Sequence, residues 1–100
     1  MKSGYRVSWT DHALEELRNT VEYLELNFSE REIKNLSERI ENTLRLVSAN
    51  PSIFPQVEGY VGIHRVVIAK FNTMYYRMNN NQIEVLSFFS NRQSPEKRSL

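Results

Sequence analysis

The stretch TDHALEELRNTVEYLELNFSEREIKNLSERIENTLRLVSANP, residues 10–51, decides the fold, because it carries two amphipathic helical patterns in succession. In its first part, apolar side chains recur at alternating steps of three and four residues, as one face of a helix requires. They are Leu14, Leu17, Val21, Leu24 and Phe28. Thr10 is a favourable N-cap residue, and Asp11 suits the first turn. We therefore predict a helix over residues 11–27.

A second helix is expected to follow at once. Ser29-Glu30-Arg31-Glu32 has the spacing of a capping box, in which the Ser29 side chain caps the helix and Glu32 reaches back. The apolar stripe continues with Ile33, Leu36, Ile40, Leu44 and Val47. Pro51 disfavours helical geometry in the residue before it, so the helix should end near Asn50. Two helices joined by so short a connection form an antiparallel hairpin.

Strand patterns flank the helical hairpin on both sides. Before it, Tyr5–Trp9 alternates apolar and polar residues. After it, the loop 51–62 with two prolines and two glycines precedes three strand-like runs, which are Ile63–Ala69, Thr73–Met78 and Ile83–Phe89. Asn79–Gln82 provides residues that tolerate a hairpin turn. The order β-α-α-β-β-β predicts one α+β domain over residues 1–100, with the helices on one face of an antiparallel meander that the first strand joins.

Composition narrows the functional classes. The chain has no cysteine, and His12 and His64 lack metal-ligand spacing, so we expect neither disulfide nor metal nor cofactor. Because no long apolar run or signal-like start is visible, we expect a cytoplasmic protein without membrane contact. Residues 1–62 carry seven basic against ten acidic side chains, net −3, and residues 63–100 carry six against two, net +4. The basic half favours an anionic partner, with a solvated surface as the equally weighted alternative.

Short motifs along residues 5–95 carry a family resemblance. After the first strand, the helical hairpin ends in Ser48-Ala49-Asn50-Pro51. Four further motifs follow, and they are Val57-Glu58-Gly59, His64-Arg65-Val66-Val67, Tyr75-Tyr76-Arg77 and Asn91-Arg92-Gln93. This pattern resembles the RelE/ParE superfamily of bacterial toxins. The resemblance implies a cognate antitoxin as partner. It also implies one of two activities, because some members cut mRNA on the ribosome and the ParE branch poisons DNA gyrase.

The resemblance also suggests site residues. Arg65 and Arg92 match the two basic positions that RelE-type nucleases use on the mRNA backbone, and they are the expected catalytic residues. Lys70 and Arg77 are the expected substrate-binding residues. Three positions depart from the nuclease pattern: Val67 replaces a strand lysine, Asn72 or Thr73 replaces an arginine, and no tyrosine follows Arg92.

Metal-free RNA cleavage needs groups that move protons and groups that stabilise a pentavalent phosphorane. Arg65, Arg77 and Arg92 suit the second task if they converge on one basic surface, although surface ion pairs explain them equally well. His64 is in phase with core residues, which favours a structural role. We expect inhibition of translation through ribosome-dependent mRNA binding or cleavage. The alternatives are a ParE-like gyrase inhibitor that acts by binding, and a non-toxic RNA-binding or adaptor module.

Overall fold

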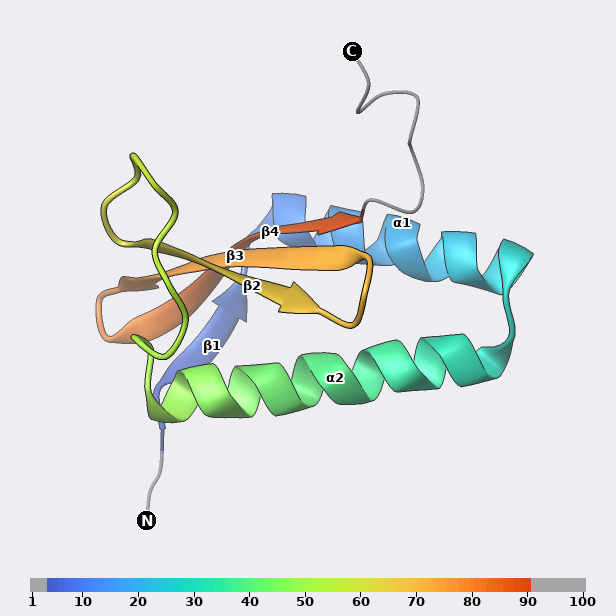
Figure 1. Cartoon of the computed structure of the whole chain (residues 1–100), viewed down its shortest axis with the longest axis horizontal. Helices are drawn as coiled ribbons and strands as arrows, with labels where there is room; N and C mark the ends of the chain where they lie inside the picture. Colours follow the sequence, from blue (N-terminus) through green and yellow to red (C-terminus); the bar gives the residue numbers. More distant parts are fainter. Residues whose placement is uncertain (1–3, 91–100) are drawn as a thin grey trace.

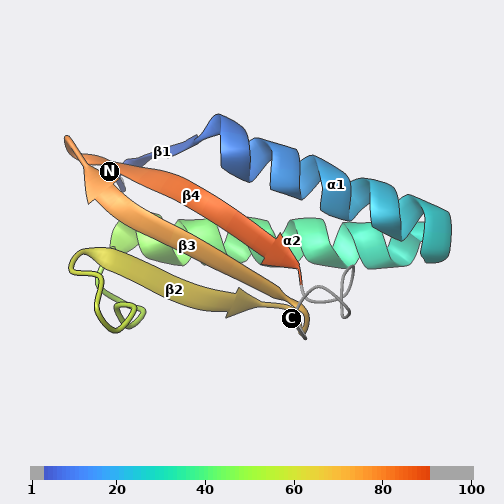
Figure 2. The ribbon, with the colours of Figure 1, turned by 90° about the horizontal axis from the view of Figure 1, so that it is seen from above.

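A computed structural model describes residues 4–90 of the chain. Its elements follow the expected order: β1 (Arg6–Trp9), α1 (Asp11–Asn27), α2 (Glu30–Ala49), β2 (Ile63–Ile68), β3 (Asn72–Asn79) and β4 (Gln82–Ser90). Figures 1 and 2 show the two helices forming a hairpin that packs on one side of the sheet. The predicted α+β architecture is therefore confirmed.

The four strands form one mixed sheet in the order β1-β4-β3-β2. The β2–β3 and β3–β4 pairs are antiparallel, as a meander requires, whereas β1 lies parallel to β4. The sheet is therefore not wholly antiparallel. The helical hairpin returns the chain to the start of β1, where the Tyr5 amide donates to the Ser48 carbonyl at 3.0 Å, and the two antiparallel turns that follow leave β4 running in the direction of β1. Asn80 and Asn81 have φ angles of 54° and 65° in the β3–β4 turn, as expected of asparagine in a tight hairpin.

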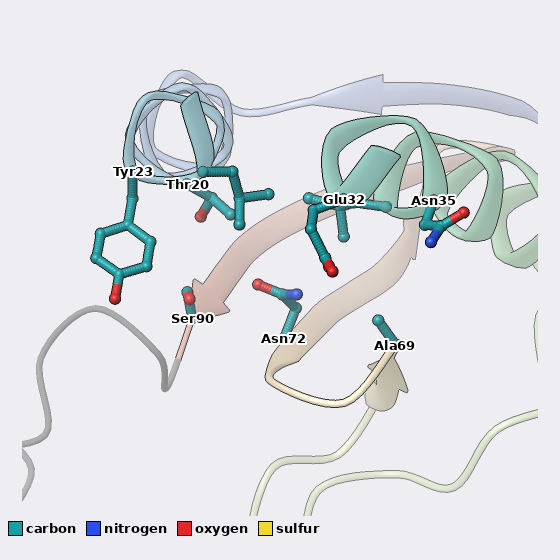
Figure 3. Close-up of a pocket in the computed structure, with 9 residues that line it drawn as sticks. Thr20, Tyr23, Glu32, Asn35, Ala69, Asn72 and Ser90 are labelled. Carbon is teal, nitrogen blue, oxygen red and sulfur yellow. The ribbon is translucent and has the colours of Figure 1, made fainter. Parts of the chain in front are cut away.

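The two helix starts differ in their caps. Thr10 caps α1 as predicted, its side chain accepting a hydrogen bond of 3.1 Å from the amide of Ala13. The predicted capping box at α2 is wrong, because the side chain of Ser29 makes no capping hydrogen bond. The backbone carbonyl of Ser29 instead accepts from the Glu32 amide at 3.1 Å. Figure 3 shows the Glu32 side chain directed toward Asn72.

The core lies between the helices and the sheet. Its largest fully buried side chains come mainly from the central strands, and they are Tyr76, Phe88, Ile68, Met74, Ile83, Val47 and Val85. Burial of this much apolar surface is the main stabilising contribution to such a fold. Within residues 4–90, no helix covers the opposite face of the sheet, which is called the open face below.

A bulge in β4 sets which side chains reach the open face. Tyr75 pairs with Ser87 and Tyr76 pairs with Val85, so Leu86 has no partner on β3. The extra residue changes the phase of the alternation, which brings both Val85 and Phe88 to the core side. The hydroxyl of Thr10 donates to the Leu86 carbonyl at 3.3 Å and ties the bulge to the start of α1.

Candidate functional site

The loop between α2 and β2, residues 50–62, is fastened along the edge of β2. The amide of Arg65 donates to the Pro55 carbonyl at 3.0 Å, and the amide of Val57 donates to the Ile63 carbonyl at 2.7 Å. A bridge also pairs Gln56 with His64. These bonds pair some of the backbone N–H and C=O groups along the edge of β2, and they hold the loop beside the open face.

The loop and the open face together form an apolar cavity of about 320 Å³. The residues that line it come from the loop, from the middle of β3 and from the bulge of β4, and they are Val57, Tyr60, Ile63, Tyr75, Leu86 and Ser87. Tyr60 is 61% exposed although it lines the cavity. A cavity of this size and composition accepts an apolar side chain of a partner.

Arg65 lies next to this cavity. Its register partner on β3 is Tyr75, which places both side chains in one row across the open face. Arg65 is exposed. It is therefore the predicted site residue whose position best suits contact with a partner.

Arg77 lies on the same face, as predicted, but it has a partner within the chain. Its Nε donates to Oε1 of Glu84 at 2.9 Å, and Asn79 donates to the same oxygen at 3.4 Å. Glu84 is also the register partner of Arg77 on the neighbouring strand. An arginine engaged in this way offers less of its charge to a phosphate.

The other predicted cations lie elsewhere. Lys70 is in the turn between β2 and β3, where its ammonium lies 5.6 Å from the centre of the Phe71 ring, as in a cation–π contact. Arg92 lies outside the described residues. Among residues 4–90, therefore, the structure brings Arg65 and Arg77 to one face and leaves Lys70 at its end. Strand alternation adds Arg6, which the sequence reading did not consider, to the far corner of this face.

His64 has a structural environment, as its phase in the strand predicted. Its Nδ1 donates to the Phe54 carbonyl at 2.8 Å, and its ring stacks on Tyr76 with centroids 5.1 Å apart. Burial raises the pKa of the Tyr76 hydroxyl, and a backbone hydrogen bond at Phe54 partly opposes this shift. Both rings serve to anchor the loop.

Several residues of the cavity were missed by sequence reasoning. Tyr60 and Val57 fall in a loop that has no period, so no pattern identified their direction. Leu86 reaches the cavity because of the bulge, and a bulge leaves no clear signal in the alternation of β4. Tyr75, by contrast, belongs to the Tyr75-Tyr76-Arg77 motif quoted in the sequence analysis.

Residues 4–90 contain no group of three or more histidine, aspartate or glutamate side chains arranged to hold a metal ion. In the same range, neither helix is long and apolar enough to cross a membrane.

Comparisons with known proteins identify the family. Residues 7–95 match the family of the ParE toxin of type II toxin-antitoxin system, parDE. No curated protein matches the chain. Among solved structures, a chain of the "Chromosomal ParDE TA system from P. aeruginosa" superposes with a TM-score of 0.67 at 16% identity, covering 86% of this chain and 95% of that chain. The likeness in structure shows a shared fold, and because the family match extends over nearly the whole sequence, the chain belongs to the ParE toxins of type II toxin-antitoxin systems.

Proposed function

We propose that this toxin arrests growth by binding a protein target through the open face of its sheet, and that the target is DNA gyrase. The observation that carries the proposal is the apolar cavity between the loop and the bulge, with Arg65 beside it. The cognate antitoxin that family membership implies would neutralise this activity. No catalytic step is needed in such a mechanism.

The composition of the site is that of a protein-binding surface. Residues whose truncation costs most in protein interfaces are often Tyr, Trp and Arg, and they gather around desolvated pockets. Here Tyr60 and Tyr75 line a cavity, whereas Arg65, in register with Tyr75, lies at its exposed rim, where a charge contributes little to affinity. An apolar side chain of the target would fill the cavity, while an acidic group of the target would pair with Arg65.

An mRNA-directed mechanism makes different demands on the same face. It requires several cations free to hold phosphates and groups that transfer protons. Of the described residues, Arg77 is engaged by Glu84, and the Nδ1 of His64 is engaged by Phe54. Arg65 and Arg92 match the nuclease pattern, so translation inhibition stays the competing hypothesis. The gyrase target is favoured because the family match is to the ParE branch.

Brief induction of the chain in bacteria separates the mechanisms. We expect DNA breaks and an SOS response with intact mRNA, and we expect purified chain to inhibit supercoiling by purified gyrase. Truncated mRNA at ribosomal A-site codons with undamaged DNA would instead establish the translation mechanism. A folded chain that produces neither effect, and no arrest, would support a non-toxic adaptor or RNA-binding module.

Two exposed apolar residues provide a matched pair of variants. Tyr60→Ala removes one wall of the cavity, and we expect it to raise the inhibitory concentration against gyrase roughly 30-fold, because truncating such an anchor costs about 2 kcal/mol. Leu26 in α1 is 85% exposed and does not line the cavity, so Leu26→Ala should leave inhibition unchanged. Thermal melts of both variants control for folding. Equal inhibition by the two variants would exclude the cavity as the binding site.

A further inference from the structure

The tip of the loop between α2 and β2, Gly59-Tyr60-Val61-Gly62, presents an apolar side chain to solvent. Val61 is 98% exposed, which is more than any other large apolar side chain among residues 4–90. Figure 1 shows the loop leaving the end of α2 and rising past the strands before the chain enters β2. Val61 is therefore not part of the hydrophobic core, and its replacement should leave the fold intact.

Hydrogen bonds fix the backbone of the loop tip. The Tyr60 amide donates to the Val57 carbonyl at 3.0 Å, and the Ile63 amide donates to the Tyr60 carbonyl at 3.2 Å. The Gly62 amide donates to Oε1 of the Gln56 side chain at 2.7 Å. The direction in which the tip points is therefore set before any partner binds, so little loop ordering opposes association.

The turn itself does not require valine at position 61. Surface turns favour Gly, Pro, Asn, Asp and Ser, and here Gly59 and Gly62, each with a φ angle of 86°, provide the positive angles. Valine is β-branched and suits strands better than turns. A single exposed apolar residue is nevertheless ordinary on a protein surface. What gives the exposure of Val61 significance is the residue beside it.

Val61 directly follows a residue that lines the apolar cavity of the open face. Tyr60, Val57 and Ile63 all line that cavity, which has a volume of about 320 Å³. A projecting and a hollow apolar feature therefore lie side by side in one loop. Resting on the function proposed above, we propose that Val61 is a second anchor for the protein target. Its side chain enters an apolar hollow on the target, while a side chain of the target fills the cavity.

A conservative substitution tests the anchor. Val61→Thr keeps the β-branched shape and replaces one methyl group with a hydroxyl, which loses its water on entering an apolar hollow. We expect the concentration of purified chain that half-inhibits gyrase supercoiling to rise about fivefold or more. Val67→Thr is the matched control, because Val67 is 58% exposed, belongs to the second half of β2 and does not line the cavity. The control should change inhibition by less than about twofold, and both variants should keep the melting temperature of the unaltered chain.

A double variant separates an anchor from a support for Tyr60. If Val61 contacts the target directly, Val61→Thr weakens inhibition in the Tyr60→Ala background by the same factor as in the unaltered chain. If Val61 only orients Tyr60, the substitution has no further effect in that background. The second result would contradict the proposal.

Other occupants of the loop tip give different patterns. Weaker antitoxin binding by Val61→Thr with unchanged gyrase inhibition would assign the hollow to the antitoxin. A free chain that sediments as a dimer, and as a monomer after Val61→Thr, with unchanged gyrase inhibition would assign it to a second copy of the chain. Either pattern would overturn the assignment to the target.

Graded induction in bacteria keeps this proposal distinct from the choice of gyrase as target. A chain that arrests growth without inhibiting gyrase would contradict the target proposed above. Val61→Thr should still need a higher level of induction for arrest than Val67→Thr, because the anchor serves whichever protein the chain binds. Arrest at equal induction of the two variants would overturn the role of Val61, whether or not gyrase is inhibited.

Discussion

The carboxylate of Glu16 in α1 accepts a hydrogen bond of 2.7 Å from the backbone amide of Phe88 in β4. The same oxygen, Oε1, accepts a second bond of 2.7 Å from the hydroxyl of Ser87. The strand β1 pairs with β4 only as far as Val85, so the amide of Phe88 lies beyond the end of the ladder. A helix side chain therefore replaces the missing strand partner.

Replacement of Glu16 should destabilise the fold. In Glu16→Ala the Phe88 amide and the Ser87 hydroxyl lose their acceptor, which costs about 1–3 kcal/mol. Glu16→Gln retains one acceptor oxygen and should lose less. Urea unfolding followed by circular dichroism measures the difference. The exposed neighbour Glu15→Ala is the control and should change stability by less than about 0.5 kcal/mol. Equal stabilities of Glu16→Ala and Glu15→Ala would contradict this role.

Tyr76 should make stability depend on alkaline pH. Its hydroxyl donates to the Pro51 carbonyl at 2.9 Å, and burial raises its pKa above the ordinary value of 10.0. A raised pKa in the folded state means that the unfolded chain loses this proton first as pH increases. The contribution is therefore fully present below pH 10 and is lost as the pH rises through the folded-state pKa.

Tyr76→Phe tests this linkage. The variant should lose about 0.5–1.5 kcal/mol at pH 7, because the hydrogen bond to Pro51 is removed. It should also show a weaker loss of stability between pH 9 and pH 11 (about one unit on either side of the ordinary tyrosine value) than the unaltered chain. Urea unfolding across this range gives both quantities. Identical pH slopes in the two proteins would show that Tyr76 does not titrate differently on folding.

The fold was largely predictable because its signals are local. Alternating steps of three and four residues defined both helices, and asparagines with positive φ defined the β3–β4 turn. The parallel pairing of β1 with β4 is a long-range contact, which no local pattern specifies. The failed capping box at Ser29 has a different origin. Its Glu32 lies against the end of the sheet, so tertiary contacts changed a preference that was sound for an isolated helix.

The candidate site was less predictable. The sequence raised the hypothesis that Arg65 and Arg77 converge on one basic surface, and strand alternation, which depends only on the backbone, does place them on one face. The pairing of Arg77 with Glu84 depends on the register between β3 and β4, and Leu86 reaches the open face because of a bulge. Contacts of this kind are determined by how distant elements pack against one another, and no short sequence motif specifies them.

Ala69 offers a test of strain in the turn after β2. Its φ angle is 60°, a left-handed conformation that costs a residue with a Cβ atom about 1–2 kcal/mol. Glycine adopts this conformation freely. It is also more flexible in the unfolded chain, and this flexibility reduces the gain in stability by about 0.4–1 kcal/mol. Ala69→Gly should therefore stabilise the protein by about 0.5–1 kcal/mol in urea unfolding. Ala49→Gly, at the last residue of α2, should destabilise it. A loss of stability in Ala69→Gly would show that this backbone is not strained.

Arg65 and Arg92 distinguish protein binding from RNA cleavage. If toxicity depends on holding an RNA phosphate, replacing either residue by alanine removes charge-assisted bonds worth roughly 1.5–3 kcal/mol each, and growth arrest disappears. Lysine would restore it only in part, because it lacks the planar fork.

If the target is a protein bound at the apolar cavity, Arg65 contributes a peripheral charge. The Arg65→Ala, Arg92→Ala double variant should then stay toxic, with inhibition of gyrase weakened by less than about tenfold. Arg65→Lys should restore the full effect, since only charge is needed. The measurements are growth arrest on induction, supercoiling inhibition, and the thermal melt of each purified variant with antitoxin removed. A folded double variant without any toxicity would favour the mRNA mechanism over the one proposed.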